Sequence, residues 1–137
     1  MGINSKRVVL GGLAAGVLNN ICGIGAAHFF FQQEIEATLK RLNLTFGPGV
    51  ALQHITMRLL MGIAVTWLYA AIRPRCGPGP RTAVVAGTAM WLFAYVWAYL
   101  GMWPYQIFSD RTLLLAALWG LLEINLTALL GAWLYRE

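Results

Sequence analysis

The sequence predicts an all-α integral membrane protein, a four-helix bundle with both termini in the cytoplasm. Hydrophobic residues make up 59% of the 137 residues and charged residues only 11%, whereas soluble domains carry about 25% charged residues. Four continuously apolar segments are long enough to cross a bilayer as helices, which takes about 20 residues. The connecting segments are too short to build another core, so residues 1–137 form a single transmembrane domain.

The predicted spans are the four apolar segments themselves, residues 8–31, 50–72, 82–103 and 112–135. Glycine and proline separate them, at residues 47–49, at residues 77–80 and at Pro104. Ser109 or Asp110 can cap the last span, because their side chains accept hydrogen bonds from free amides at a helix start. The apolar runs do not alternate with polar residues, which excludes β-barrel strands.

The longest connection, residues 32–48, carries its own helical pattern. Ile35, Leu39 and Leu42 recur at helical spacing, and Glu36 can pair with Lys40 one turn later. We therefore expect a helical extension that lies on the membrane surface. An ordinary polar loop is the alternative.

The basic residues indicate orientation rather than nucleic-acid binding. They sit at the ends of the apolar runs and form no patch on a soluble face, although the net charge is +5. The side that holds both termini carries six of them, Lys6, Arg7, Arg73, Arg75, Arg81 and Arg136. The other side carries three, Lys40, Arg41 and Arg111. The positive-inside rule then predicts cytoplasmic termini and contact of these residues with anionic lipid.

Arg58 in the second span and Glu123 in the fourth are charged residues inside apolar segments. Each costs about 2.5–3.5 kcal/mol at the centre of a membrane, and such residues are candidate functional sites. Arg58 lies nine residues before Trp67 and Glu123 ten before Trp133, and both tryptophans begin a Trp-Leu-Tyr sequence. The two charges therefore lie at similar depth and are predicted to form an ion pair. The pair either fixes helix register or relays a proton or substrate.

Asparagines add a polar midsection to the same depth. Asn19 shares a helix face with small residues and should point into the bundle, while Asn125 and Thr127 follow Glu123 in the fourth span and complete the polar midsection. Their simplest role is interhelical hydrogen bonding, worth about 0.6 kcal/mol each in a membrane.

His28 and His54 form a second candidate constellation near the outer surface. They lie 21 and 19 residues from Arg7 and Arg73 and so reach similar depth. Two imidazoles on neighbouring helices could hold a haem or ligate a chlorophyll. Alternatively, His54 extends the polar network of Arg58, which lies four residues away on the same helix face.

Small residues predict how the helices pack. Gly12 and Gly16 form a small-xxx-small pair in the first span. In the third span, one face is predicted to carry the small residues Ala83, Gly87, Ala94 and Ala98. The other face would carry Trp91, Tyr95 and Tyr99 as an exposed aromatic ridge that meets lipid or another subunit.

Three sequence segments resemble a group of small four-helix bacterial membrane proteins. These are Trp-Leu-Tyr-Ala-Ala-Ile-Arg-Pro-Arg from Trp67, Gly-Pro-Gly-Pro-Arg-Thr-Ala from Gly77 and Gly-Ala-Trp-Leu-Tyr-Arg-Glu from Gly131. The resemblance covers roughly residues 62–137. It implies a location in the bacterial inner membrane and carries over no functional residues.

The sequence contains no nucleophile elbow, phosphate loop, HExxH or CxxC motif, so we expect no enzyme. Two cysteines are too few for a metal site. The first hypothesis is therefore an accessory or structural subunit that binds other membrane subunits or further copies of itself. The second is a small transporter or proton-coupled channel that uses Glu123 and Arg58. The third is a haem- or chlorophyll-binding subunit that uses His28 and His54.

Overall fold

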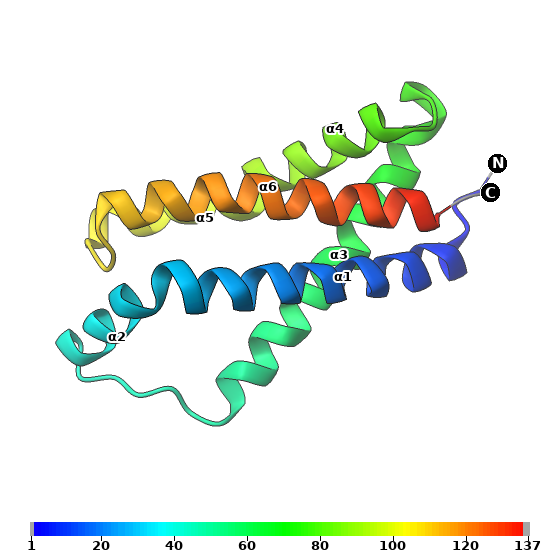
Figure 1. Cartoon of the computed structure of the whole chain (residues 1–137). Helices are drawn as coiled ribbons and strands as arrows, with labels where there is room; N and C mark the ends of the chain where they lie inside the picture. The colour runs from blue at the N-terminus through cyan, green and yellow to red at the C-terminus, as the bar shows by residue number, and fades with distance from the viewer. Residues whose placement is uncertain (1, 136–137) are drawn as a thin grey trace.

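The computed structural model describes residues 2–135, which are helical with short connections and contain no strand within that range. In the same range, four helical segments are long and apolar enough to cross a membrane: Ser5–Arg41, Gly49–Cys76, Pro80–Tyr105 and Asp110–Leu134. Three of these segments run roughly alongside one another, whereas the second crosses them obliquely (Figure 1). The first three segments extend beyond the predicted spans at both ends, and the fourth begins two residues earlier and ends one residue earlier than predicted.

The first segment is a single long helix with a change of pitch inside it. It comprises α1 (Ser5–Ala26), a π-helical turn η1 (Ala27–Phe31) and α2 (Gln32–Arg41). Asn4 caps its start by accepting a hydrogen bond from the Arg7 amide at 3.2 Å. No proline or glycine interrupts residues 26–46, so the helix predicted for the connection continues directly from the first span. The remaining loop, residues 42–48, leads to α3.

The other three segments follow the predicted breaks. They comprise α3 (Gly49–Cys76), then α4 (Pro80–Trp91), the π-helical turn η2 (Leu92–Val96), α5 (Trp97–Met102) and the 3-10 turn η3 (Trp103–Tyr105), and finally α6 (Asp110–Leu134). Gly77 and Gly79 have φ angles of 82° and 128°, which favour glycine and reverse the chain between α3 and α4. Ser109 caps α6 through the Thr112 amide at 3.3 Å, one of the two caps expected.

Glycines set the closest helix contact, between α1 and α3. A Cβ atom on Gly62 of α3 would lie 2.6 Å from the Gly16 Cα of α1. Cβ atoms on Gly12 and Gly16 would in turn lie 2.5 and 2.7 Å from the Cα atoms of Ile63 and Leu59. The predicted small-xxx-small pair on α1 therefore meets a glycine of α3, and the backbones approach as they do where membrane helices pack through small residues.

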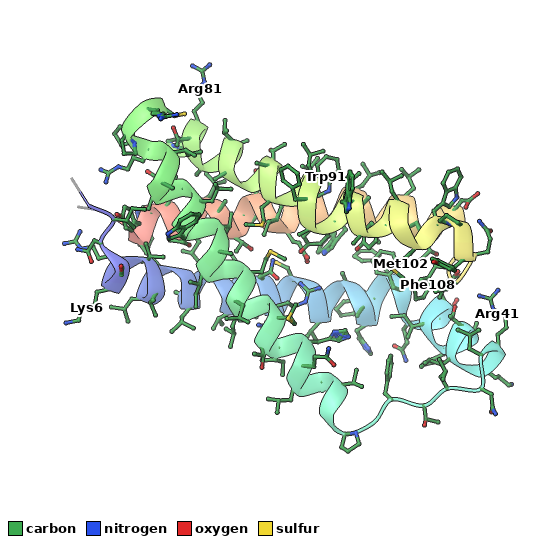
Figure 2. All side chains as sticks on the ribbon, turned by 180° about the vertical axis from the view of Figure 1, so that it is seen from behind. Lys6, Arg41, Arg81, Trp91, Met102 and Phe108 are labelled. Carbon is green, nitrogen blue, oxygen red and sulfur yellow. The ribbon has the colours of Figure 1, made fainter. Side chains whose placement is uncertain are left out.

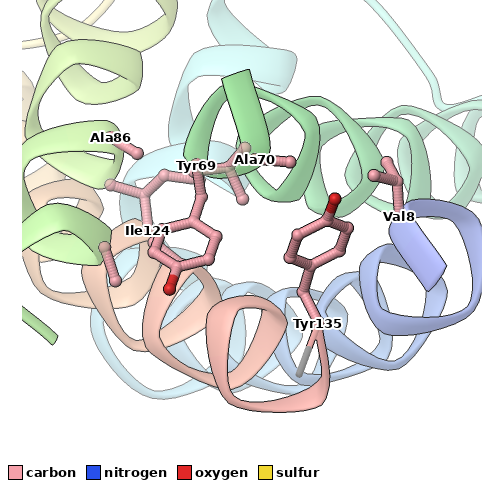
Figure 3. Close-up of a cluster of buried hydrophobic side chains, with 9 residues drawn as sticks. Val8, Tyr69, Ala70, Ala86, Ile124 and Tyr135 are labelled. Carbon is pink, nitrogen blue, oxygen red and sulfur yellow. The ribbon is translucent and has the colours of Figure 1, made fainter. Parts of the chain in front are cut away.

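An aromatic pair fills the interior near the start of α1 and the end of α6. Tyr69 and Tyr135 are 4% and 2% exposed and pack edge to face with their ring centres 6.2 Å apart. Figure 3 shows them near Val8 and Ile124. The Asn4 amide donates to the Tyr135 hydroxyl at 3.2 Å, so the two ends of the described chain lie on the same side of the bundle.

Basic residues mark both ends of the bundle unequally. Figure 2 shows Lys6 and Arg81 at the end where α1 begins and Arg41 at the opposite end. Arg7 belongs to the former group by its place in the first turns of α1, and Arg111 to the latter by its place at the start of α6. The helices thus separate the two groups of basic residues as the span boundaries predict.

Gly62→Ala tests whether the α1–α3 contact depends on the missing side chain. We expect a loss of about 1–3 kcal/mol in unfolding free energy, because the new methyl group would overlap the backbone of α1. Thermal unfolding of the purified protein in detergent measures the change. Gly25→Ala is the matched control, since a Cβ atom there meets nothing within 4 Å. Equal unfolding temperatures for the two variants would contradict the packing described.

Candidate functional site

The ion pair predicted between Arg58 and Glu123 is present and joins α3 to α6. The Arg58 Nη1 atom lies 3.1 Å from the Glu123 Oε1 atom. The two side chains differ in exposure, since Glu123 is 1% exposed and Arg58 is 30% exposed. Glu123 is therefore the buried member of the pair, and Arg58 is the member whose side chain is partly exposed and lines a cavity, as described below.

Two aromatic side chains complete the surroundings of Glu123. The Tyr95 hydroxyl of η2 donates to Oε1 at 2.6 Å, and the Trp119 indole of α6 donates to Oε2 at 3.1 Å. Together with Arg58, the described residues thus supply three hydrogen bonds from three different helical segments. Charge-assisted hydrogen bonds of this kind compensate a carboxylate for lost hydration. Neither role was predicted from the sequence, although the spacing of four residues between Trp119 and Glu123 places both on one face of a helix.

Asn19 links the ion pair to α1, as its predicted position inside the bundle allows. Its side chain is fully buried. Arg58 Nη1 donates to the Asn19 main-chain oxygen and to its Oδ1 atom, both at 3.0 Å. The Asn19 Nδ2 group donates to the Thr127 hydroxyl at 3.1 Å, which itself donates to the Glu123 main-chain oxygen at 2.7 Å. One continuous network therefore joins α1, α3, η2 and α6.

Gly23 leaves room on α1 for the arginine head group. A Cβ atom at this position would overlap the carbon and both terminal nitrogens of the Arg58 guanidinium. The guanidinium therefore lies directly against the α1 backbone. Any larger residue at position 23 would displace Arg58 from Glu123.

Asn125 does not join this network, which corrects the sequence-based prediction. Its Nδ2 group donates to the Leu121 main-chain oxygen at 2.8 Å, within its own helix. The Oδ1 atom is buried against α4, and a Cβ atom on Gly87 would lie 2.6 Å from it. The reason is helical geometry, because two residues along an α-helix rotate a side chain by about 200°. Asn125 therefore points away from the face that carries Glu123.

The aromatic ridge predicted from Trp91, Tyr95 and Tyr99 is also wrong, because these residues face the bundle. Trp91 donates to the Ala117 main-chain oxygen of α6 at 2.7 Å, and Tyr99 packs on Tyr95 edge to face. The π-helical turn η2 takes more residues per turn than an α-helix, so it keeps a face spaced by four residues in register. On η2 and α5, the exposed aromatic residues are instead Phe93 and Trp97, at 76% and 74%.

A cavity of about 210 Å³ lies beside the ion pair. Its walls come from all four long helical segments, and its lining residues are Gly23, Ala26, Ala27, Phe31, Ile35, Arg58, Tyr95, Tyr99, Met102, Phe108, Thr112, Leu113, Ala116, Trp119 and Glu123. Both π-helical turns contribute, η1 through Ala27 and Phe31 and η2 through Tyr95. Single π-helical turns inside α-helices are rare and occur frequently at functional sites. We call this space the Glu123 cavity.

Contacts between α2 and the turn before α6 hold together the end of the bundle beyond this cavity. The Arg41 guanidinium donates to the main-chain oxygens of Gln106 and Ile107. The Glu34 carboxylate accepts a hydrogen bond from the Ser109 amide at 3.0 Å. Because Phe108 lies within this turn and lines the cavity, these contacts position part of its wall.

The two histidines lie outside this site. His28 is exposed in η1, packs edge to face on Phe29 and borders a surface hollow with Phe30 and Gln32. His54 is exposed near the start of α3 and does not line that hollow. The structure therefore does not bring the two imidazoles into one cavity, and the tetrapyrrole site stays a prediction from the sequence.

Neither the arrangement of ligand-type residues nor similarity to other proteins suggests an activity. Within residues 2–135, no group of three or more His, Cys, Asp or Glu side chains could hold a metal ion. Comparison with protein-family models, curated proteins and solved structures found no match for this chain. The Glu123 cavity is consequently the strongest guide to function.

A double-mutant cycle on Arg58 and Glu123 measures how strongly the pair is coupled. Arg58→Met alone should cost about 3–5 kcal/mol of stability, because it leaves a buried carboxylate without its cation. Adding Glu123→Gln should recover part of this loss, with a coupling energy on the order of 1–3 kcal/mol. Unfolding in detergent measures the stability of the wild type, the two single variants and the double variant.

The matched control replaces an arginine that lies outside the network. The stability changes of Arg81→Met, at the start of α4, and Glu123→Gln should be additive. Arg81 is exposed and shares no hydrogen-bond partner with Glu123 among residues 2–135. A coupling near zero for Arg58 and Glu123 would mean that the ion pair does not stabilise the fold.

Proposed function

We propose that this chain is a small membrane transporter that binds its substrate in the Glu123 cavity. One observation carries the proposal: a cavity inside the bundle borders a buried carboxylate and a partly exposed guanidinium. Transporter sites commonly lie between helices near the middle of the membrane, where a regular α-helix is interrupted. Here the π-helical turns η1 and η2 interrupt two of the long helices beside the cavity.

The packing on one side of the cavity supports a site that is closed toward the start of α1 and the end of α6. Along the helices in that direction from the ion pair lie the fully buried residues Ala15, Val65, Thr66 and Thr127. Beyond them, Tyr69 and Tyr135 fill the interior. Alternating access requires a site that is blocked on one side at a time, and this arrangement corresponds to one such state.

The proposed setting is the bacterial inner membrane, with both termini in the cytoplasm. Support comes from the four apolar helices of residues 5–134 and from the surplus of basic residues on the side of the termini. The sequence resemblance to small bacterial membrane proteins supports the same setting. Glycosylation or protease accessibility of an added tag at either terminus tests the orientation.

An accessory subunit of a larger membrane complex is the second candidate function. Phe93 and Trp97 are the observation in its favour, because both stand out from η2 and α5 as a partner surface would require. Bilayer lipid can cover these aromatic side chains equally well, so the accessory-subunit function ranks second. Co-purification of a partner in mild detergent, lost in a Phe93→Ala and Trp97→Ala variant, would favour it.

Ala116→Trp tests the proposed transporter by filling the Glu123 cavity. We expect a small molecule that co-purifies with the wild type to fall at least about tenfold in this variant, since the new indole occupies its space. Mass spectrometry of extracts from protein purified in native lipid discs measures this content. The molecule identified is then tested for uptake into proteoliposomes, which Glu123→Gln should abolish.

Leu118→Trp is the control, because Leu118 is 54% exposed on the outer face of α6. It adds the same side chain to the same helix without reaching the cavity. Equal amounts of the co-purified molecule in the wild type, Ala116→Trp and Leu118→Trp would argue against a binding site in the cavity. So would the absence of a specific molecule from the wild type.

A further inference from the structure

We propose that the Glu123 cavity takes an anionic amphiphile whose carboxylate or phosphate head binds Arg58 and whose hydrocarbon chain lies along the apolar wall. This inference rests on the proposed function and names the substrate class for the same site. It is carried by the hydrogen-bonding capacity of Arg58 that the fold leaves unused.

Among residues 2–135, the Arg58 guanidinium forms its hydrogen bonds through one nitrogen. Nη1 donates to Asn19 and to Glu123. A guanidinium has five N–H donors, and those on Nη2 and Nε have no hydrogen-bond acceptor among the described residues. An apolar environment makes unused charged donors costly, so an acceptor from outside the chain is strongly favoured there.

The shape of these donors matches an anion with two oxygens. The guanidinium plane presents parallel N–H groups that bind carboxylate or phosphate in a bidentate manner. Tyr99 also lines the cavity, and its hydroxyl has no hydrogen-bond partner among residues 2–135. It can add a further donor to the same head group. Arg58 can hold Glu123 with one nitrogen and the ligand with the others.

A cationic ligand fits this site poorly. Of the described residues that line the cavity, Glu123 alone carries a carboxylate, and it is 1% exposed and already accepts hydrogen bonds from Arg58, Tyr95 and Trp119. A cation would have to displace Arg58 and would meet the guanidinium first, because that group is the accessible one. The guanidinium repels another positive charge, which disfavours cationic ligands.

The rest of the wall suits a hydrocarbon chain. Its apolar lining includes Phe31, Ile35, Met102, Phe108 and Leu113. Near Arg58, residues 51–57 at the start of α3 are all exposed. The first turns of α3 diverge from α2 in both views (Figures 1 and 2). An amphiphile in the bilayer can therefore approach Arg58 sideways, from lipid, on the side where α3 stands apart.

The test compares three ten-carbon probes that differ in head group: decanoate, decanol and decyltrimethylammonium. Native mass spectrometry and calorimetry measure their binding to the full chain in phosphatidylcholine nanodiscs. We expect one decanoate per protein, bound at least about tenfold more tightly than decanol, because only the anion gains charge-assisted hydrogen bonds. The cation should bind more weakly than decanol.

Arg58→Lys should weaken decanoate binding by about 10- to 100-fold, because lysine keeps the charge but loses the planar fork. Arg81→Lys is the matched control at an exposed arginine outside the cavity, and it should change nothing. Ala27→Trp provides a variant that leaves Arg58 intact, since exposed Ala27 lines the cavity and a bulky side chain there obstructs it. It should weaken all three probes.

Phosphatidylglycerol nanodiscs identify the source of the anion. If this lipid weakens decanoate binding tenfold, a lipid head group competes for the site; unchanged binding indicates a free amphiphile. Either result supports an anionic head at Arg58.

Decanol or the cation binding as tightly as decanoate would overturn the inference, and so would unchanged affinity in Arg58→Lys. In either of these outcomes, loss of probe binding in Ala27→Trp would still support the cavity as the binding site. The proposed transporter would then remain, but its preference for an anion would not. Failure of all three probes to bind the wild type would overturn the inference. The proposed function is tested separately, by mass spectrometry of the molecules that co-purify with the wild type and with Ala116→Trp.

Discussion

Burial of the Glu123 carboxylate is the constraint on which the middle of this molecule depends. An ionised carboxylate loses several kcal/mol of hydration in an apolar interior unless a cation and hydrogen-bond donors replace water. Arg58, Tyr95 and Trp119 supply these donors from α3, η2 and α6. Asn19 extends the same network to α1. Helices that share only weakly directional apolar contacts thereby acquire a defined register, since any rotation would leave a buried charge without its partners.

Glycine packing makes this arrangement geometrically feasible. The close approach of Gly12 and Gly16 to Gly62 lets α3 cross α1 with almost no side-chain spacer. Gly23 then leaves space for the guanidinium against the α1 backbone. The oblique crossing has a second consequence, because the first turns of α3 stand apart from α1 (Figure 1) and residues 51–57 are all exposed there. The close contact and the accessible side of Arg58 thus have the same cause.

The π-helical turns connect helix register to the cavity. Each inserts residues into a turn at some cost in hydrogen-bond geometry, and both border the same space. The wider turn of η2 keeps its own Tyr95 on the same inward face as Tyr99 of α5, so that Tyr95 reaches Glu123. A regular α-helix would carry these positions progressively around the axis. The irregular turns are therefore part of what builds the site, and their position supports a binding role for the cavity.

The sequence by itself determined the number and approximate extent of the apolar helices, the helical connection after residue 31, and the pairing of Arg58 with Glu123. These three features depend on segment length, hydropathy and distance along a helix, which can be counted from the sequence. Within α6 the regular period of 3.6 residues already places Trp119 on the face of Glu123 and turns Asn125 away from it. Only the tertiary structure decided which helices these faces meet. Tyr95 became a hydrogen-bond donor to Glu123 because the π-helical turn η2 and the helix crossings set its direction in a way that the regular period does not describe.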